Sequence, residues 1–182
     1  MRLSELVIAA VFGLSASVAF GQAVSADSAD GPYKVVKIAK VGGEGGFDYV
    51  AADPDNRHLY VPRSGRPSGR VSVYDLDTLK LVGEVPNVNG GHGAAVDPKT
   101  GHVFVSSNPV VMFDSKTLAV IKTIQVRGNP DGIFFEPSTE RIYVLSHRAP
   151  HVTVINAVDG AIAGTIDLGG APEEGSPDGN PR

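Results

Sequence analysis

A pattern that returns about every 40 residues constrains the fold of this chain more than any other feature. Its clearest marker is an acidic residue followed by proline, and the three acidic residues lie 44 and 39 positions apart, at Asp53, Asp97 and Glu136. Seven positions after each marker comes an aromatic residue followed by valine, at Tyr60-Val61, Phe104-Val105 and Tyr143-Val144. Such a period indicates that the chain stacks copies of one supersecondary unit, so we expect a repeat architecture.

Each copy contains four short segments with the composition of β-strands. In the third copy, the apolar segment 133–135 leads into the acidic-Pro turn, where proline fixes φ and ends the strand's hydrogen-bond ladder. The β-branched and aromatic segment 141–145 then returns from the turn. A further pair of apolar segments follows in every copy, as at 71–74 in the first. Four antiparallel strands per repeat predict an all-β fold made of β-propeller blades, with a β-sandwich as the alternative.

These motifs resemble a known family. The Asp-Pro turn, the Tyr-Val strand and the Asp-x-x-Thr-Leu turn that begins at Asp75 and again at Asp114 resemble the YVTN-type β-propeller repeat, found in YncE-like and surface-layer-like periplasmic proteins. The resemblance covers residues 34–170, which it divides into three blades. It implies the fold but little chemistry, because the family mixes binding proteins with proteins of unknown role. A family member ordinarily carries roughly seven blades, within the range that closes a ring.

The first segment reads as an export signal. Leu6–Phe20 is apolar and uncharged, and it is shorter than the roughly 20 residues that span a bilayer as a helix. We therefore predict a helical signal peptide at residues 1–21, cleavage before Gln22 and a flexible lead-in at 22–33. The mature protein would be periplasmic or secreted and would have no membrane span. An uncleaved membrane anchor and a core helix are the alternatives.

Residues 171–182 resemble the start of a fourth blade that stops. Glu173 follows Ala-Pro as Asp131 follows Asn-Pro, but Gly, Ser and Pro at 175–177 replace the apolar strand that should come next. Since closed propellers have four to eight blades, three predict an open, partial propeller. We expect a truncated or frameshifted gene product. The alternative is a short chain that completes a ring by self-association.

A titratable residue stands five positions before each acidic-Pro turn. These residues are Asp48, His92 and Asp131, and Glu173 is the equivalent residue of the interrupted fourth copy. At the start of the innermost strand they would surround the mouth of the central channel. Carboxylates and imidazoles are ligands for a divalent cation and are also acid–base groups. The alternative is that short polar residues cap the strand entry and stay solvated.

The loops between the second and third strands of each copy should lie at the same end of the blades. They supply four candidate ligand-binding residues, Arg63, Asn108, His147 and Arg148. Arg63 belongs to a loop with three arginines, and a guanidinium offers a bidentate fork to a carboxylate or phosphate. A solvated surface loop is the alternative interpretation.

Composition limits the function further. The chain has no cysteine, which excludes disulfides and thiolate chemistry, and its net charge of −4 disfavours nucleic acid as a partner. We therefore predict a non-catalytic binding scaffold that holds a protein or a small molecule on one propeller face. The alternatives are a lactonase-like propeller hydrolase with a divalent metal at the channel mouth, and a DNA-binding protein like those suggested among YncE-like proteins.

Overall fold

The computed structural model describes residues 31–65, 68–148 and 151–179, and the chain divides into two units, Met1–Ile38 and Ala39–Arg182. In the described part of the first unit, residues 31–38 are exposed and form neither helix nor strand. The predicted signal peptide and its cleavage point lie outside the described residues. Among the residues that are described, no helix is long and apolar enough to cross a membrane.

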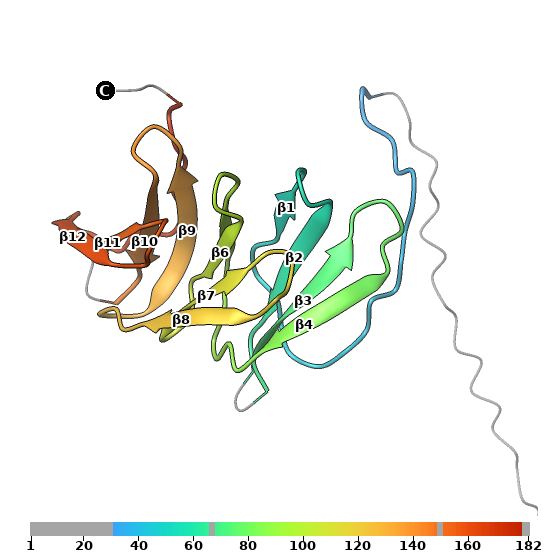
Figure 1. Cartoon of the computed structure of the whole chain (residues 1–182), viewed down its shortest axis with the longest axis horizontal. Coiled ribbons are helices and arrows are strands. Elements are labelled where there is room, and N and C mark those ends of the chain that lie inside the picture. Colours follow the sequence, from blue (N-terminus) through green and yellow to red (C-terminus); the bar gives the residue numbers. More distant parts are fainter. Residues whose placement is uncertain (1–30, 66–67, 149–150, 180–182) are drawn as a thin grey trace, which may run out of the picture. The chain divides into compact units, whose positions relative to one another are not determined.

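The second unit contains three antiparallel sheets of four strands, each formed by one sequence repeat (Figure 1). The first sheet comprises β1 (Ala51–Asp53), β2 (His58–Arg63), β3 (Arg70–Asp75) and β4 (Leu81–Pro86). The second comprises β5 (Ala94–Asp97), β6 (His102–Val105), β7 (Val110–Asp114) and β8 (Val120–Ile124). The third comprises β9 (Pro130–Glu136), β10 (Arg141–Ser146), β11 (His151–Asn156) and β12 (Ile162–Asp167). Within each sheet, strands adjacent in sequence pair with each other, which confirms the predicted all-β fold.

The turn between the third and fourth strands of a sheet follows from its sequence motif. Asp75 Oδ1 accepts hydrogen bonds from the backbone N and the hydroxyl of Thr78, both at 2.7 Å. Leu79 then adopts a left-handed backbone with φ of 57°. The turn closes because the Leu79 N donates to the Asp75 carbonyl at 2.8 Å. Leu118 at φ 59° and Gly160 at φ 67° occupy the equivalent position in the other two sheets. The Asp-x-x-Thr-Leu motif therefore encodes one side-chain-capped turn.

The two central strands of the middle sheet, β6 and β7, are buried on both faces. Alternate residues of a strand point to opposite sides, so each strand contributes to two apolar clusters. Val103 and Val105 of β6 pack with the first sheet, against Tyr60 among others, whereas Phe104 between them packs with the third sheet, against Ile142. The residues of β7 alternate in the same way between the cluster on the side of the first sheet and the cluster on the side of the third. The core of this unit is therefore two apolar layers between successive sheets.

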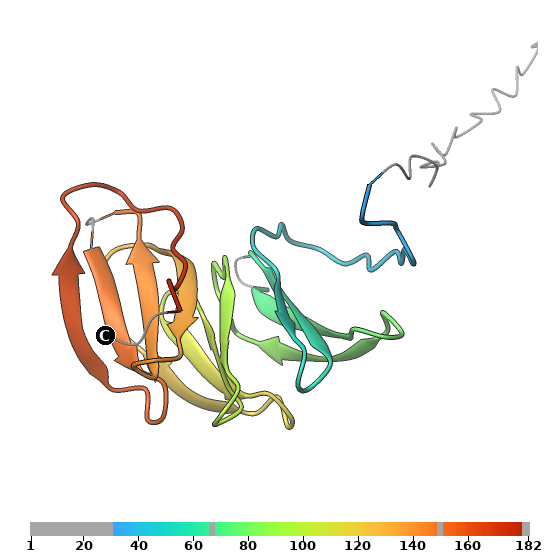
Figure 2. The same ribbon diagram turned by 90° about the horizontal axis from the view of Figure 1, so that it is seen from above.

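The first strands of the three sheets are the inner ones. β5 contacts both β1 and β9, and the three sheets lie side by side in sequence order (Figure 2). The three strands line a hollow of about 440 Å³ with small and apolar residues such as Ala51, Ala94 and Ile133. The fourth strands, β4, β8 and β12, are mostly exposed. This arrangement gathers the entries of β1, β5 and β9 at one end of the unit, where the predicted cation ligands lie.

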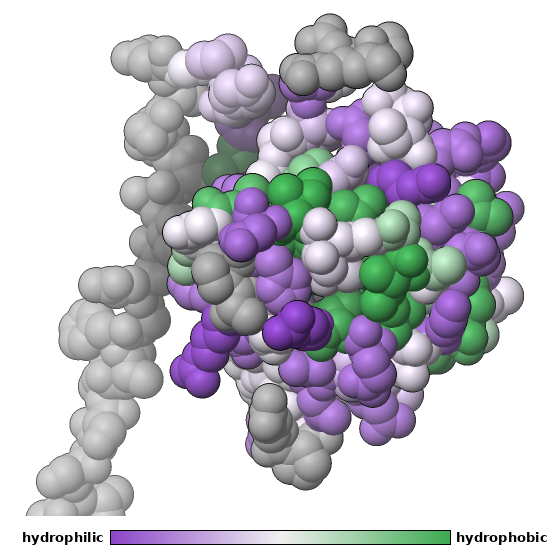
Figure 3. Space-filling model, turned by 90° about the vertical axis from the view of Figure 1, so that its left-hand side faces the viewer, coloured by the Kyte–Doolittle hydropathy of each residue, from purple (hydrophilic) through white to green (hydrophobic). Residues whose placement is uncertain are grey.

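Within the part of the chain that the structure describes, no other sheet covers one face of the third sheet. Phe134 and Tyr143 stack there with ring centroids 5.0 Å apart and planes 2° from parallel. Apolar residues gather among polar ones on this side of the molecule (Figure 3). Residues 171–179 form no strand, and Gly175 lies directly against the Phe134 ring.

Candidate metal-binding site

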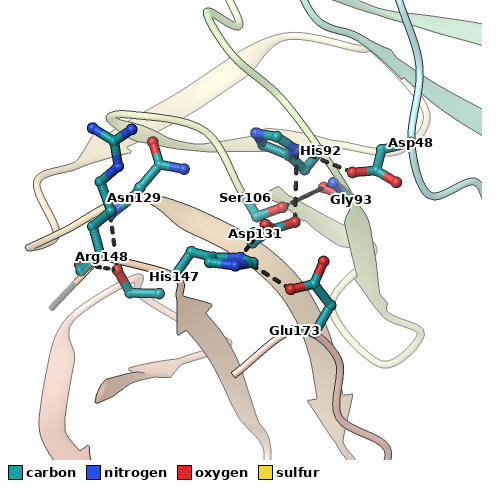
Figure 4. Close-up of polar contacts among 10 residues, drawn as sticks. Asp48, His92, Gly93, Ser106, Asn129, Asp131, His147, Arg148 and Glu173 are labelled. Carbon is teal, nitrogen blue, oxygen red and sulfur yellow. Dashed lines mark hydrogen bonds and ion pairs between the residues drawn. The ribbon is translucent and has the colours of Figure 1, made fainter. Parts of the chain in front are cut away.

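Three of the predicted cation ligands come from the entries of the inner strands. Asp48 lies three residues before β1, His92 lies two residues before β5, and Asp131 is the second residue of β9. A backbone hydrogen bond joins the first two entries, because Tyr49 N donates to the His92 carbonyl at 3.1 Å. The repeat therefore places three equivalent residues side by side (Figure 4).

The third sheet and the segment after it add two more side chains to this group. His147 directly follows β10, and its backbone N donates to the Asn129 carbonyl at 3.0 Å. Glu173 reaches the site because its backbone passes close over Gly132 of β9. A Cβ at position 132 would lie only 2.4 Å from the Glu173 carbonyl oxygen, so glycine is required for this approach.

The five side chains form a row in which carboxylates and imidazoles alternate. His92 Nδ1 lies 3.2 Å from Asp48 Oδ2 and 3.6 Å from Asp131 Oδ1. His147 Nδ1 lies 2.9 Å from Asp131 Oδ2 and 3.1 Å from Glu173 Oε2. Asp131 therefore stands in the middle of the row, with one carboxylate oxygen facing each histidine (Figure 4). We call these five residues the carboxylate–histidine cluster.

Burial is deepest at the centre of the cluster. The Asp131 side chain is 10% exposed, whereas the outer carboxylates of Asp48 and Glu173 are 52% and 66% exposed. Asp131 Oδ1 is buried and has no hydrogen-bond partner among the described residues. A buried carboxylate oxygen without a hydrogen bond is costly, so this atom is a position where a cation would be stabilised.

The electrostatic field of the cluster acts on a neighbouring tyrosine. Burial, followed by the negative charges of Asp131 and Asp48, raises the pKa of the Tyr49 hydroxyl above its ordinary value. Glu173 and Glu174 act in the same direction. The region around the cluster therefore has the negative potential that attracts a cation.

Two buried serines fix the backbone that carries the histidines. Ser106 Oγ accepts from the N of Gly93 at 2.8 Å, next to His92. Ser146 Oγ accepts from the N of Asn129 at 2.8 Å and donates to the Arg148 carbonyl at 3.0 Å, on either side of His147 in the fold. The same residue type thus holds the strand entry in place in two successive sheets.

The four residues predicted as cation ligands all belong to the cluster. His147 was predicted to bind a ligand of another kind, so its place among the possible cation ligands was missed. The signal was available, since the equivalent positions in the other repeats are Ser64 and Asn108, and only the third repeat carries a titratable residue there. Cation binding itself remains a prediction, and so does ligand binding at the loops.

The other predicted ligand-binding residues lie outside the cluster. Arg63 is 5% exposed, and its Nη2 donates to the carbonyls of Gly42 at 2.7 Å and Gly43 at 3.1 Å. Asn108 Nδ2 donates to the Gly128 carbonyl at 3.3 Å and so connects two loops. Arg148 is exposed beside His147. Arg63 therefore stabilises the loop that precedes the first strand of its own sheet.

The three four-stranded antiparallel sheets define the class of protein as a β-propeller, of which three blades are described. The sequence matches no protein-family model and no curated protein. Solved structures do match. Hydrazine synthase of Kuenenia stuttgartiensis is similar at 23% identity and a TM-score of 0.62, over 69% of this chain and 37% of that chain.

Two further similar structures are the WD40 repeats of RRP9 and the protein U3-55K. The WD40 repeats of RRP9 match at 12% identity and a TM-score of 0.56, over 65% of this chain and 37% of that one. U3-55K matches at 12% identity and a TM-score of 0.56, over 65% of this chain and 38% of that one. This chain therefore spans less than two fifths of the length of these structures. At such identities, the similarity establishes the β-propeller fold alone.

Proposed function

We propose that this chain is part of an exported β-propeller of the YVTN repeat type that serves as a binding scaffold, with a divalent cation held by the carboxylate–histidine cluster. The YVTN motifs and the apolar segment 6–20 support the family and the export. The single observation that carries the cation is the convergence of Asp48, His92, Asp131, His147 and Glu173 from separate parts of the chain.

The ligand types select the class of cation. Two imidazole nitrogens among carboxylate oxygens suit zinc, manganese, iron, cobalt or nickel better than calcium or magnesium, which take oxygen ligands. The three carboxylates bring negative charge, and the imidazoles do not neutralise it unless they are protonated. A divalent transition-metal ion would offset two of these three negative charges and would give Asp131 Oδ1 the partner that it lacks.

The bound cation would stand where ligands reach a propeller, at the loop end of its inner strands. A protein or a small molecule with a carboxylate or another metal-binding group would bind there through the exposed side of the ion. The exposed outer carboxylates, Asp48 and Glu173, indicate that this side is open to solvent. The acidic cluster and the net charge of −4 oppose nucleic acid as the partner.

The same exposure favours one second candidate, a metal-dependent hydrolase of the lactonase-like type. A cation bound by protein ligands on one side and by water on the other lowers the pKa of that water and polarises a carbonyl group. The cluster residues not engaged by the ion would then be available to move a proton.

The test is a metal titration of the purified protein after treatment with a chelator. We expect Zn²⁺ or Mn²⁺ to bind with a Kd in the micromolar range or below and to raise the melting temperature, since about 2.7 kcal/mol of stabilisation accompanies a ligand concentration of 100 times Kd. Asp131→Asn should weaken binding at least tenfold, whereas Asp55→Asn, an exposed carboxylate outside the cluster, should leave it unchanged.

The outcomes separate the two functions. Equal affinity in wild type and Asp131→Asn would refute the cation site. Binding without hydrolysis of lactones and esters by the metal-loaded protein supports the scaffold, whereas metal-dependent hydrolysis that Asp131→Asn abolishes supports the enzyme.

A further inference from the structure

Asp131 divides its two carboxylate oxygens between two separate groups of ligands. Oδ1 belongs with Asp48 Oδ2 and His92 Nδ1, and Oδ2 belongs with His147 Nδ1 and Glu173 Oε2. Within each group the ligand atoms of the three residues lie within 4.8 Å of one another. The two groups have the same composition, a histidine between two carboxylates, and share one residue.

Hydrogen bonds alone do not satisfy this arrangement. Each Nδ1 carries at most one hydrogen, yet each faces two carboxylate oxygens. His147 Nδ1 lies within 3.1 Å of both of its neighbours, and His92 Nδ1 lies at 3.2 and 3.6 Å from its own. One oxygen of each pair must therefore go without a hydrogen from its histidine, and Asp131 Oδ1 is such an atom that has no other donor among the described residues. A cation is not limited in this way, because it accepts all three ligands at once.

The spacing between histidine and carboxylate in each group is that of ligands around one metal ion. With metal–ligand bonds of roughly 2.0–2.2 Å, the ligand atoms of a tetrahedral site lie about 3.4 Å apart. The four contacts between a histidine and a carboxylate in the cluster span 2.9 to 3.6 Å. Each group therefore needs only small side-chain movements to close around an ion.

We propose that the cluster is a two-metal centre bridged by the Asp131 carboxylate, an inference that rests on the proposed function of the same site. Asp48, His92 and Asp131 Oδ1 bind one transition-metal ion, and Asp131 Oδ2, His147 and Glu173 bind the other. Two oxygens of one carboxylate hold ions about 3.5–4 Å apart, as in known two-metal sites. Three protein ligands leave a position on each ion for water or an anion, so the ligand class is a phosphate or carboxylate that bridges both ions.

The number of ions bound per chain tests this proposal. Isothermal titration of the chelator-treated protein with Zn²⁺, checked by metal analysis after gel filtration, should give two ions per chain. Titration with Mn²⁺ should give the electron paramagnetic resonance spectrum of an exchange-coupled pair. Asp48→Asn and Glu173→Gln should each retain one ion and lose the coupled spectrum, because each change removes an exposed ligand from only one group.

Matched variants and the possible outcomes complete the test. Glu174→Gln, next to Glu173 but outside both groups, should keep two ions, and Asp131→Asn should lose at least tenfold in affinity for both. One ion per chain that Asp48→Asn and Glu173→Gln weaken equally would refute the bridge and leave the proposed cation site intact. No bound ion at all would refute both. Circular dichroism of each variant establishes that the blades remain folded.

Discussion

The acidic-Pro turn that reveals the repeats should also contribute much of the stability of the first sheet. Asp53 is 2% exposed, and its Oδ1 accepts from the backbone N of Asp55 and of Asn56, both at 3.1 Å. Its Oδ2 accepts from Asn56 Nδ2 at 2.9 Å and from the Tyr60 hydroxyl at 3.3 Å. Asp53→Ala removes four hydrogen bonds at a buried position.

The expected loss follows from what the substitution leaves unpaired. A hydrogen bond to a charged group contributes roughly 1.5–3 kcal/mol, and a buried donor left unsatisfied costs roughly 1–3 kcal/mol. The Tyr60 hydroxyl would be such a donor, since Tyr60 is fully buried, whereas the donors at Asn56 are near solvent. Because the four bonds share one acceptor and are not additive, we expect Asp53→Ala to lower the free energy of unfolding by about 3 kcal/mol.

Urea unfolding followed by circular dichroism at pH 7 measures this loss. The control is Asp75→Ala, which removes the capping carboxylate of an exposed turn in the same sheet and should cost clearly less. Tyr60→Phe isolates the hydroxyl, and the double variant Asp53→Ala/Tyr60→Phe should recover part of the loss because no buried donor remains unpaired. The reasoning fails if Asp53→Ala costs no more than Asp75→Ala, or if Tyr60→Phe recovers nothing.

Two further predictions concern acid stability and export. Backbone and side-chain hydrogen bonds from Thr117 hold the pKa of Asp114 below its ordinary value. The folded pKa is therefore below the unfolded one of roughly 3.9, so the stabilisation is complete above that pH and is lost as the pH falls through the folded pKa. Asp114→Asn should reduce the loss of unfolding free energy that urea titrations measure between roughly pH 7 and pH 2.5. An unchanged dependence of the unfolding free energy on pH would contradict the assignment. For export, mass spectrometry of the protein from fractionated cells should find a chain that begins at Gln22 outside the cytoplasm, and a chain retaining residues 1–21 in the cytoplasm would overturn it.

The blades could be predicted from sequence because their signals are local. The acidic-Pro turn and the Asp-x-x-Thr-Leu turn each fix a few backbone angles through one side chain and its near neighbours. In strands such as β6, successive residues pack against two different sheets, so the buried ones are all apolar and the sequence shows a continuous apolar run. The left-handed backbone of Leu79 was not predicted, because leucine rarely adopts it and only the closed turn imposes it.

The site could be predicted in part. Asp48, His92, Asp131 and Glu173 were found because the repeat assigns them equivalent positions, and equivalent positions of adjacent blades are neighbours in space. The opposite holds for Arg63. Its sequence context suggested an anion-binding side chain, but the fold turns it inward to the carbonyls of Gly42 and Gly43.

The sequence by itself therefore determined the repeat, its strands and the row of titratable residues at the strand entries, since all of these depend on spacing along the chain. Only the tertiary structure brought His147 to Asp131. It also showed how Glu173, which the repeat had predicted, reaches the site by the passage of the last segment over Gly132. It also divided the two oxygens of Asp131 between two histidines. The physical reason is that ligand geometry depends on contacts between residues distant in sequence, and those distances are fixed only when the sheets pack together.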